Sequence, residues 1–156
     1  MSLFIFLDTG PLGAITNPKR PPETVAMLRW AAIQIRAGHR FFVPAIADYE
    51  VRRELIRLGK TAGIETLDAW NQAVPDRYLP LTDTALKRAA TLWADARNRG
   101  VVTADPKELD CDALIAAQTL EYQAVHGLEP QNIVVATTNV GHLSRFVPAR
   151  LWSEIV

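Results

Sequence analysis

Short apolar runs alternate along the chain with longer segments in which apolar residues recur every three to four positions. Three of the short runs are rich in β-branched or aromatic residues and are bounded by turn formers, so they predict buried strands. These runs cover Leu3–Leu7, Phe41–Val43 and Ile133–Ala136, and the C-terminal Leu151–Val156 is a weaker fourth candidate. Strands that are apolar throughout are typical of a parallel sheet whose two faces are both covered.

The segments between these runs have the periodicity of amphipathic helices. We expect helices over Glu23–Arg36, Ile46–Leu58, Thr61–Val74, a segment from a cap at Thr82 or Asp83 to Arg97, and a segment from Asp110 or Asp112 to about Val125. Proline precedes the first of these helices and glycine follows the fourth, as is usual at helix ends. The alternation of strands and helices predicts the α/β class, with three α/β/α layers around a central parallel sheet.

The length of 156 residues fits one domain, which we expect to span residues 1–156. Lys and Arg number 17, as do Asp and Glu, so the net charge is zero and only a local basic cluster would attract nucleic acid. Cys111 is the single cysteine, which excludes an intrachain disulfide and suits a reducing cytoplasm. The run Leu3–Leu7 is too short for a signal peptide, and no run reaches the length of a membrane span. We therefore expect a cytoplasmic protein without membrane association.

Acidic and polar residues follow the predicted strands. Asp8 ends the first strand, and Thr137 and Asn139 end the strand near the C-terminus. Glu50 lies on the helix after the second strand, and Asp112 is expected in the first turn of a later helix. Because ligands of open parallel sheets bind at the carboxyl ends of the strands, we expect Asp8, Glu50, Asp112 and Asn139 to meet at one edge.

Three carboxylates gathered in one place repel one another by about 1 kcal/mol per pair in water, and by more where water is excluded. A divalent cation would neutralise them, and ligands that are oxygen atoms alone select Mg²⁺ or Mn²⁺. The helix macrodipole would help Asp112 to stay ionised in a first turn. Such a site leaves coordination positions to water and phosphate, so it predicts phosphodiester hydrolysis by metal-activated water.

Each of these residues also has a purely structural interpretation. Asp8 before Thr9 and Gly10 is a turn former, and Asp110 and Asp112 are both credible helix N-caps. The pairs Glu50–Arg53 and Glu54–Arg57 have the spacing of surface ion pairs on a helix. The histidines have no ligand spacing and are interpreted as structural or exposed; they are His39, His126 and His142.

Four stretches together resemble the PIN domain (PilT N-terminus) family, the metal-dependent nucleases that include the VapC toxins of bacterial toxin–antitoxin pairs. They are "FLDTGPL", "VPAIADYEVRREL", "DCDALIAAQTL" and "VVATTNVGHL". The resemblance implies a ribonuclease that uses Mg²⁺ or Mn²⁺, acts on RNA, is held in check by a cognate antitoxin and forms a homodimer.

The resemblance also implies roles for particular residues. Asp8, Glu50 and Asp112 would be the catalytic metal ligands, and Asn139 would complete the metal site. Thr137 would support the site, and we add Asp110 as a second supporting residue. Arg52 and Arg53 are carried by the same predicted helix as Glu50, so we expect them to bind the phosphate backbone of the substrate.

The chain departs from the family pattern at three places. The fourth acidic position is Asn139, which lowers the negative charge of the site. His142 stands where an aspartate is common, and the segment Val101–Leu109 is longer than usual.

Two other functions stay open at this point. A PIN-like module that binds RNA or a protein without cleavage is favoured by the zero net charge and by Asn139. A phosphatase of the haloacid-dehalogenase type also begins with a strand that ends in aspartate, but it needs a second aspartate where this chain has Gly10.

Overall fold

A central sheet organises the chain. The computed structural model describes residues 1–100 and 106–156, with only the backbone of 106–108. Within these residues five strands form one parallel sheet in the order β3-β2-β1-β4-β5. The strands are β1 (Phe4–Leu7), β2 (Arg40–Pro44), β3 (Tyr78–Leu79), β4 (Ile133–Thr137) and β5 (Ala149–Leu151). The chain runs from β1 through β2 to β3 at one edge and then returns to β4 on the other side of β1, and ligands bind at such a switch point.

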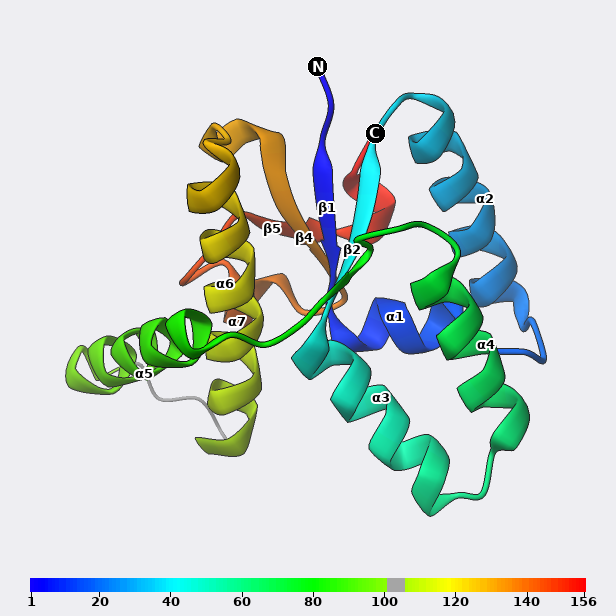
Figure 1. Cartoon of the computed structure of the whole chain (residues 1–156), viewed down its shortest axis with the longest axis horizontal. Coiled ribbons are helices and arrows are strands. Elements are labelled where there is room, and N and C mark those ends of the chain that lie inside the picture. Colours follow the sequence, from blue (N-terminus) through cyan, green and yellow to red (C-terminus); the bar gives the residue numbers. More distant parts are fainter. Residues whose placement is uncertain (101–105) are drawn as a thin grey trace.

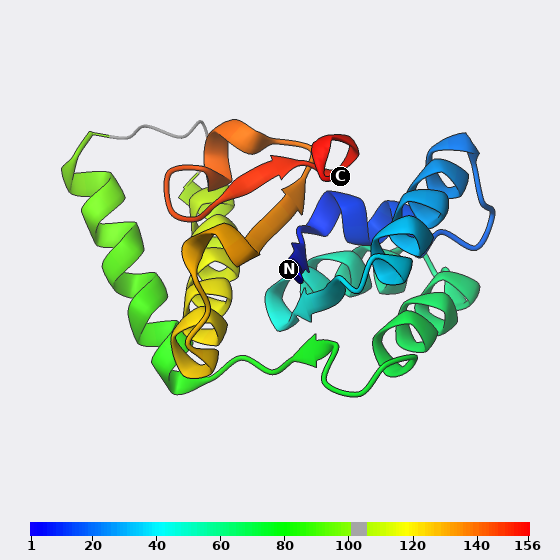
Figure 2. The same ribbon diagram turned by 90° about the horizontal axis from the view of Figure 1, so that it is seen from above.

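Helices cover both faces of this sheet, as the view from above shows (Figures 1 and 2). They are α1 (Thr9–Ile15), α2 (Pro22–Arg36), α3 (Ala45–Arg57), α4 (Thr61–Gln72), α5 (Asp83–Asn98), α6 (Pro106–His126) and α7 (Val140–Leu143), with 3₁₀ turns at Pro130–Asn132 and Trp152–Glu154. In Figure 2, α5 and α6 lie on one side of the sheet, and α1, α2 and α4 lie on the other. The predicted three-layer α/β fold is confirmed.

Successive side chains of β2 show how the two outer layers are fastened to the sheet. Phe41 packs edge-on against Trp30 of α2 and Trp70 of α4, at 5.2 and 6.0 Å between ring centroids. Phe42 turns to the opposite face, where it meets Tyr122 of α6 at 4.6 Å. Because neighbouring residues of a strand point to opposite faces, an all-apolar strand places a core on both sides.

The elements depart from the sequence predictions at particular places. The helices α1 and α7 and the two-residue strand β3 were not predicted. The C-terminal strand is β5, which ends at Leu151, and the predicted strand over Leu151–Val156 is wrong because a 3₁₀ turn follows. Ile155 in that segment instead accepts hydrogen bonds at its carbonyl from the side chains of Trp30 and Gln34.

The start of α6 is the other departure. The helix begins at Pro106, so Asp110 and Asp112 lie inside it and neither is its N-cap. Leu109, one turn before Ala113, is fully buried, which explains why the helix extends toward the N-terminus of both aspartates. The part of the predicted long segment that covers residues 101–105 lies outside the described residues. In the described part of the chain, no helix has the length and apolar character that a bilayer crossing needs.

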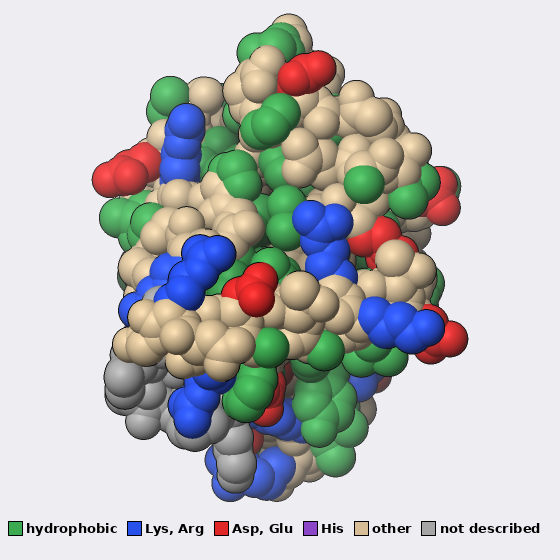
Figure 3. All heavy atoms as spheres, turned by 90° about the vertical axis from the view of Figure 1, so that its left-hand side faces the viewer, with side chains coloured by type: hydrophobic (Ala, Val, Ile, Leu, Met, Phe, Trp, Pro, Cys, Tyr) green, Lys and Arg blue, Asp and Glu red, His purple; other side chains and the backbone are tan. Residues whose placement is uncertain are grey.

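The outer face on the α5 side carries both signs of charge. Figure 3 shows Lys and Arg side chains interspersed there with Asp and Glu, with apolar side chains between them. This face therefore offers no continuous basic tract for a phosphate backbone, in line with the zero net charge.

Candidate functional site

Asp8 is held at the carboxyl end of the central strand by three hydrogen bonds. Its backbone N–H donates to the carbonyl of Ala136 in β4 at 3.0 Å. Its side chain caps α1, since Oδ1 accepts from the backbone N–H of Thr9 at 2.8 Å. The hydroxyl of Thr137, the last residue of β4, donates to Oδ2 at 2.7 Å. Asp8 is thus both the structural cap that its position allows and a fixed carboxylate at the switch point.

Glu50 is joined to the same point by a side chain that the sequence analysis did not single out. The hydroxyl of Thr9 donates to Oε1 of Glu50 at 2.8 Å, and the Glu50 side chain is 19% exposed. Beside Thr9, the backbone of Gly10 lies close to the loop after β4, since a Cβ on Gly10 would stand 3.0 Å from the hydroxyl oxygen of Thr138. Thr9 directly follows the aspartate that ends the first strand, and this position is the sequence feature that could have marked Thr9 as a site residue.

Asp112 approaches the edge from α6, on the opposite side from α3. Its side chain is 15% exposed, and its Oδ2 lies 3.7 Å from Nδ1 of His142. Cys111 next to it forms a hydrogen bond with Glu50, and burial together with the charge of Glu50 raises the pKa of its thiol to about 12. Asp112 lies in the second turn of α6, so the argument that the helix macrodipole keeps it ionised is wrong.

The loop after β4 completes the edge. The backbone N–H of Asn139 donates to the hydroxyl of Thr137 at 2.9 Å, so the hydroxyl that serves Asp8 also fixes this turn. The side-chain amide of Asn139 meets Nδ1 of His142 at 3.3 Å. His142 therefore borders the candidate site, with its side chain 30% exposed. Its position one turn after Asn139 was the signal for this.

The Asp8 carboxylate is placed where ionisation is costly. Burial raises the pKa of the Asp8 carboxyl above its ordinary value, and the nearby charge of Glu50 adds to this, while the hydrogen bonds from Thr137 and Thr9 lower it in part. A cation at this edge would relieve both raising effects, since it favours the ionised form.

The donor chemistry suits Mg²⁺ or Mn²⁺ without forming a complete cage. Among the described residues, no three His, Cys, Asp or Glu side chains form a group that could hold a metal ion as they stand. Asp8 and Glu50 are instead both bonded to Thr9, Asp8 by its backbone N–H and Glu50 by its hydroxyl. Mg²⁺ is usually held by one or two carboxylates and keeps several waters, so this oxygen-rich edge fits such an ion.

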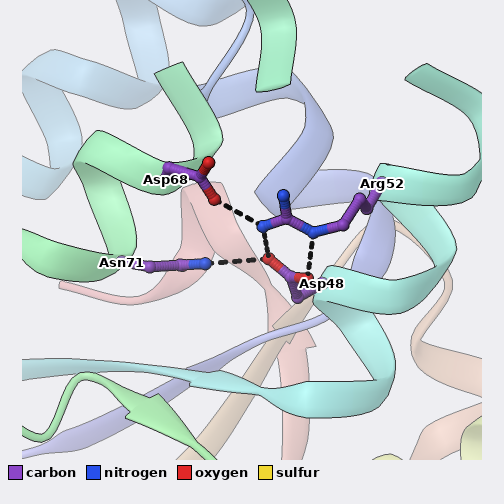
Figure 4. Close-up of polar contacts among 4 residues, drawn as sticks. All are labelled: Asp48, Arg52, Asp68 and Asn71. Carbon is purple, nitrogen blue, oxygen red and sulfur yellow. Dashed lines mark hydrogen bonds and ion pairs between the residues drawn. The ribbon is translucent and has the colours of Figure 1, made fainter. Parts of the chain in front are cut away.

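The predicted cations and Asp110 lie in different surroundings. Arg53 is half-exposed and its guanidinium stands 3.7 Å from Oε2 of Glu50, so it borders the site. Arg52 points to the other side of α3, where it is bound by Asp48 and Asp68 (Figure 4). Asp110 is exposed on α6. The structure thus brings Arg53 to the carboxylates and directs Arg52 away from them.

A pocket of about 660 Å³ opens beside the carboxylates. Thr9 and Glu50 line it, and apolar side chains such as Val51 of α3 and Leu58, the residue that follows this helix, form part of its wall. The pocket therefore joins charged oxygen atoms to an apolar surface.

Comparisons with known proteins agree with the geometry. The sequence profile of the PIN domain matches residues 5–138. No curated protein sequence matches the chain. Among solved structures, one chain of VapBC2 from Rickettsia felis, bound to a DNA fragment from their promoter, has a TM-score of 0.66 at 15% identity, with 96% of this chain and 99% of that chain covered.

Two further structures have the same fold. A chain of FitAcB from Neisseria gonorrhoeae has a TM-score of 0.64 at 21% identity, with 97% and 99% of the two chains covered. A chain of VapBC-1 from nontypeable Haemophilus influenzae has a TM-score of 0.62 at 17% identity, with 97% and 100% covered. At these identities the likeness concerns the fold, and it extends over nearly the whole chain.

Proposed function

The chain belongs to the PIN domain family, and from this premise we propose that it is a cytoplasmic, metal-dependent endoribonuclease. Asp8, Glu50 and Asp112 would hold Mg²⁺ or Mn²⁺, with Asn139 completing the metal site and Thr137 supporting it. The ion would supply the positive charge that offsets the carboxylates and the charge that develops on a phosphodiester under attack. The absence of a second aspartate at Gly10 and the family match set the phosphatase alternative aside.

The observation that carries this proposal is the hydrogen bond from the Thr9 hydroxyl to Glu50. It fixes a glutamate of α3 next to the aspartate that ends β1, although 41 residues separate Thr9 from Glu50. In this arrangement Thr137 and Thr9 orient the two carboxylates, because each hydroxyl donates to a carboxylate oxygen. The half-exposed Arg53 is placed to meet a substrate phosphate once that phosphate reaches the edge.

The test is cleavage of a mixture of structured and single-stranded RNAs by the purified protein. We expect cleavage with Mg²⁺ or Mn²⁺, none with a chelator, and a loss of at least about 100-fold in Glu50→Gln. The matched control is Glu65→Gln, which removes an exposed carboxylate on α4 and should cleave like the wild type. Equal cleavage by Glu50→Gln and the wild type would exclude the proposal.

A non-cleaving PIN-like module is the remaining alternative, and one measurement separates it. Calorimetric titration with Mn²⁺ reports metal binding independently of the choice of RNA. Metal binding without cleavage of any RNA in the mixture would favour a binding module, in which Asn139 in place of a carboxylate weakens the site.

We also propose that the protein is the toxin of a type II toxin–antitoxin pair. The support is the fold, which it shares with chains of VapBC and FitAB structures, and the pocket beside the carboxylates. An antitoxin segment with apolar side chains would fit the wall at Leu58, which is 50% exposed. Leu58→Asp should therefore abolish co-purification with the product of a small neighbouring gene, whereas Leu86→Asp on α5 should not.

The family implies a homodimer as well. Size-exclusion chromatography with light scattering measures the mass of the particle directly. A monomer at all concentrations would contradict this part of the proposal and leave the nuclease proposal untouched.

A further inference from the structure

A second cluster of charged side chains lies on the side of α3 that faces α4, and the proposed reaction does not use it (Figure 4). We call it the α3–α4 clamp, and it consists of Asp48, Arg52, Asp68 and Asn71. Arg52 donates from Nε to Oδ1 of Asp48 at 2.8 Å, and from Nη2 to Oδ2 of Asp48 at 3.0 Å and to Oδ1 of Asp68 at 2.6 Å. The amide of Asn71 donates to Oδ2 of Asp48 at 2.8 Å.

Asp48 is the centre of the clamp. It is only 6% exposed, and both of its carboxylate oxygens accept hydrogen bonds. Its partners come from its own helix and from α4, so the clamp fastens the two helices by directional bonds. A buried ion pair of this kind is weak evidence for stability, because apolar side chains of similar size do as well or better. Its value lies in the orientation that it imposes.

The contacts of α3 differ in how strictly they fix its rotation. Of its thirteen residues only Ala47 and Asp48 are buried, and the partly buried Ile46, Val51 and Leu55 also pack against the core. Apolar side chains pack almost equally well when a helix turns by a few degrees, but a bidentate hydrogen bond does not. The directional contacts that set the rotation of α3 on the side of α4 are therefore those of Asp48.

That setting decides where Glu50 points. Two residues along a helix correspond to about 200° around its axis, so Glu50 lies on the face of α3 opposite to Asp48. Its bond to Thr9 is 2.8 Å long, whereas its contact with the half-exposed Arg53 is 3.7 Å. A small rotation of α3 would break the first contact, and the second is too weak to restore it.

We infer that Asp48, through Arg52, Asp68 and Asn71, is a positioning residue that holds Glu50 at the carboxylate edge. The inference rests on the proposed role of Glu50 in the nuclease site. It gives Arg52 a function different from the substrate binding that the sequence suggested.

The chain contains its own reporter of the position of Glu50. Cys111 is the single cysteine, and it forms a hydrogen bond with Glu50. Cys111 is partly buried, so displacement of the Glu50 side chain opens the thiol to reagents. The rate at which iodoacetamide alkylates Cys111 therefore measures whether Glu50 is in place, and it needs neither metal nor RNA.

The experiment is a double-mutant cycle at pH 8, in chelator and well below the melting temperature of every variant. We expect Glu50→Ala and Asp48→Asn each to raise the alkylation rate about three- to tenfold, because both remove the Glu50 carboxylate from its place beside the thiol. The double variant should react at the rate of Glu50→Ala alone, because Asp48 acts through Glu50. Arg57→Gln, which breaks the exposed ion pair of the same helix, should react like the wild type.

Two results would overturn the inference. One is a wild-type alkylation rate in Asp48→Asn together with a lowered melting temperature, which is a structural role alone. The other is a rate in the double variant equal to the product of the two single effects, which is general loosening around the thiol. If Asp48→Asn does not fold, Asp68→Asn loosens the clamp from its more exposed end, and the same two outcomes apply.

The outcome is independent of the proposed function. Glu50→Ala that alkylates faster but cleaves RNA at the wild-type rate would exclude the nuclease role of Glu50 while the positioning by Asp48 holds. Loss of cleavage in Glu50→Gln with no change of alkylation in Asp48→Asn gives the reverse result.

Discussion

The helix α3 carries carboxylates on two of its faces, and the two faces treat them in opposite ways. In the α3–α4 clamp, the buried Asp48 is bound by a guanidinium and an amide. At the carboxylate edge, Asp8 and Glu50 receive hydrogen bonds from the hydroxyls of Thr137 and Thr9. A guanidinium neutralises a carboxylate, whereas a hydroxyl orients it and leaves its charge in place.

This difference distinguishes a structural acidic cluster from a candidate metal site. The clamp has its cation built into the chain, and that cation points away from the edge. At the edge, the guanidinium of the half-exposed Arg53 stands 3.7 Å from Glu50. Negative charge that is held in place by neutral donors, with burial raising the pKa of Asp8, is the arrangement that a divalent cation would complete.

The largest expected effect is on RNA cleavage by Asp8→Asn. Asparagine can still cap α1 through its side-chain oxygen, so the fold should be kept while the charge is lost. We expect cleavage to fall by at least about 100-fold, with Mn²⁺ affinity in calorimetry falling in parallel. Undiminished Mn²⁺ binding by this variant would show that the metal does not bind at the edge that carries Asp8.

Breaking the clamp should have the next largest effect, this time on stability. Arg52→Met leaves the buried Asp48 without its cation, and we expect a loss of about 2–3 kcal/mol, less than for a fully buried pair because Arg52 is 30% exposed. Urea denaturation followed by circular dichroism measures it.

The double variant Asp48→Leu with Arg52→Met sharpens the comparison. It replaces the ion pair by apolar side chains, so we expect most of the lost stability to return. Fast alkylation of Cys111 should persist, because the directional bonds that hold Glu50 are still absent. Recovery of both properties would mean that packing alone sets α3.

The main strands and helices could be predicted because burial leaves a direct trace in the sequence. The uniformly apolar runs became the three central strands, and Thr82 caps α5 as expected, accepting from the N–H of Ala85. The helix α1 was missed because Gly10, Pro11 and Gly13 have low helix propensity. It forms because Asp8 caps it and because Leu12 and Ile15 are buried.

The sequence predicts where in the fold the carboxylate edge lies, but it does not predict the hydrogen bonds formed there. Strand order brings Asp8 next to Thr137, and the parallel fold implies this from the sequence. The bond from Thr9 to Glu50 and that from Arg52 to Asp68 depend on how α1, α3 and α4 pack, which no local pattern encodes. The i,i+4 spacing of Asp48 and Arg52 was readable, but their burial was not.

A smaller effect is expected on the stability of metal-free Asp8→Asn. The pKa of the Asp8 carboxyl is raised in the folded protein, so its protonated form stabilises the fold. This contribution to the free energy of unfolding is fully present below the ordinary pKa of 3.8 and is lost as the pH rises through the pKa of the folded state. At neutral pH the ionised Asp8 therefore destabilises the metal-free protein. We expect the variant to melt higher at pH 7, by the few degrees that about 1 kcal/mol gives, and to lose this advantage in acid. A variant that melts at the wild-type temperature at pH 7 would contradict this expectation.

The smallest effect is expected at the third acidic pair of α3. Arg57 donates to Glu54 at 2.8 and 3.0 Å, distances as short as those of the clamp, but the side chains are 66% and 55% exposed. The hydrogen bond to Arg57 lowers the pKa of the Glu54 carboxyl, yet water and salt screen a pair in this position. We expect Arg57→Gln to melt at the wild-type temperature at low and high salt. A clear loss of stability would mean that pairing itself, and not the burial of Asp48, distinguishes the clamp from the rest of the helix.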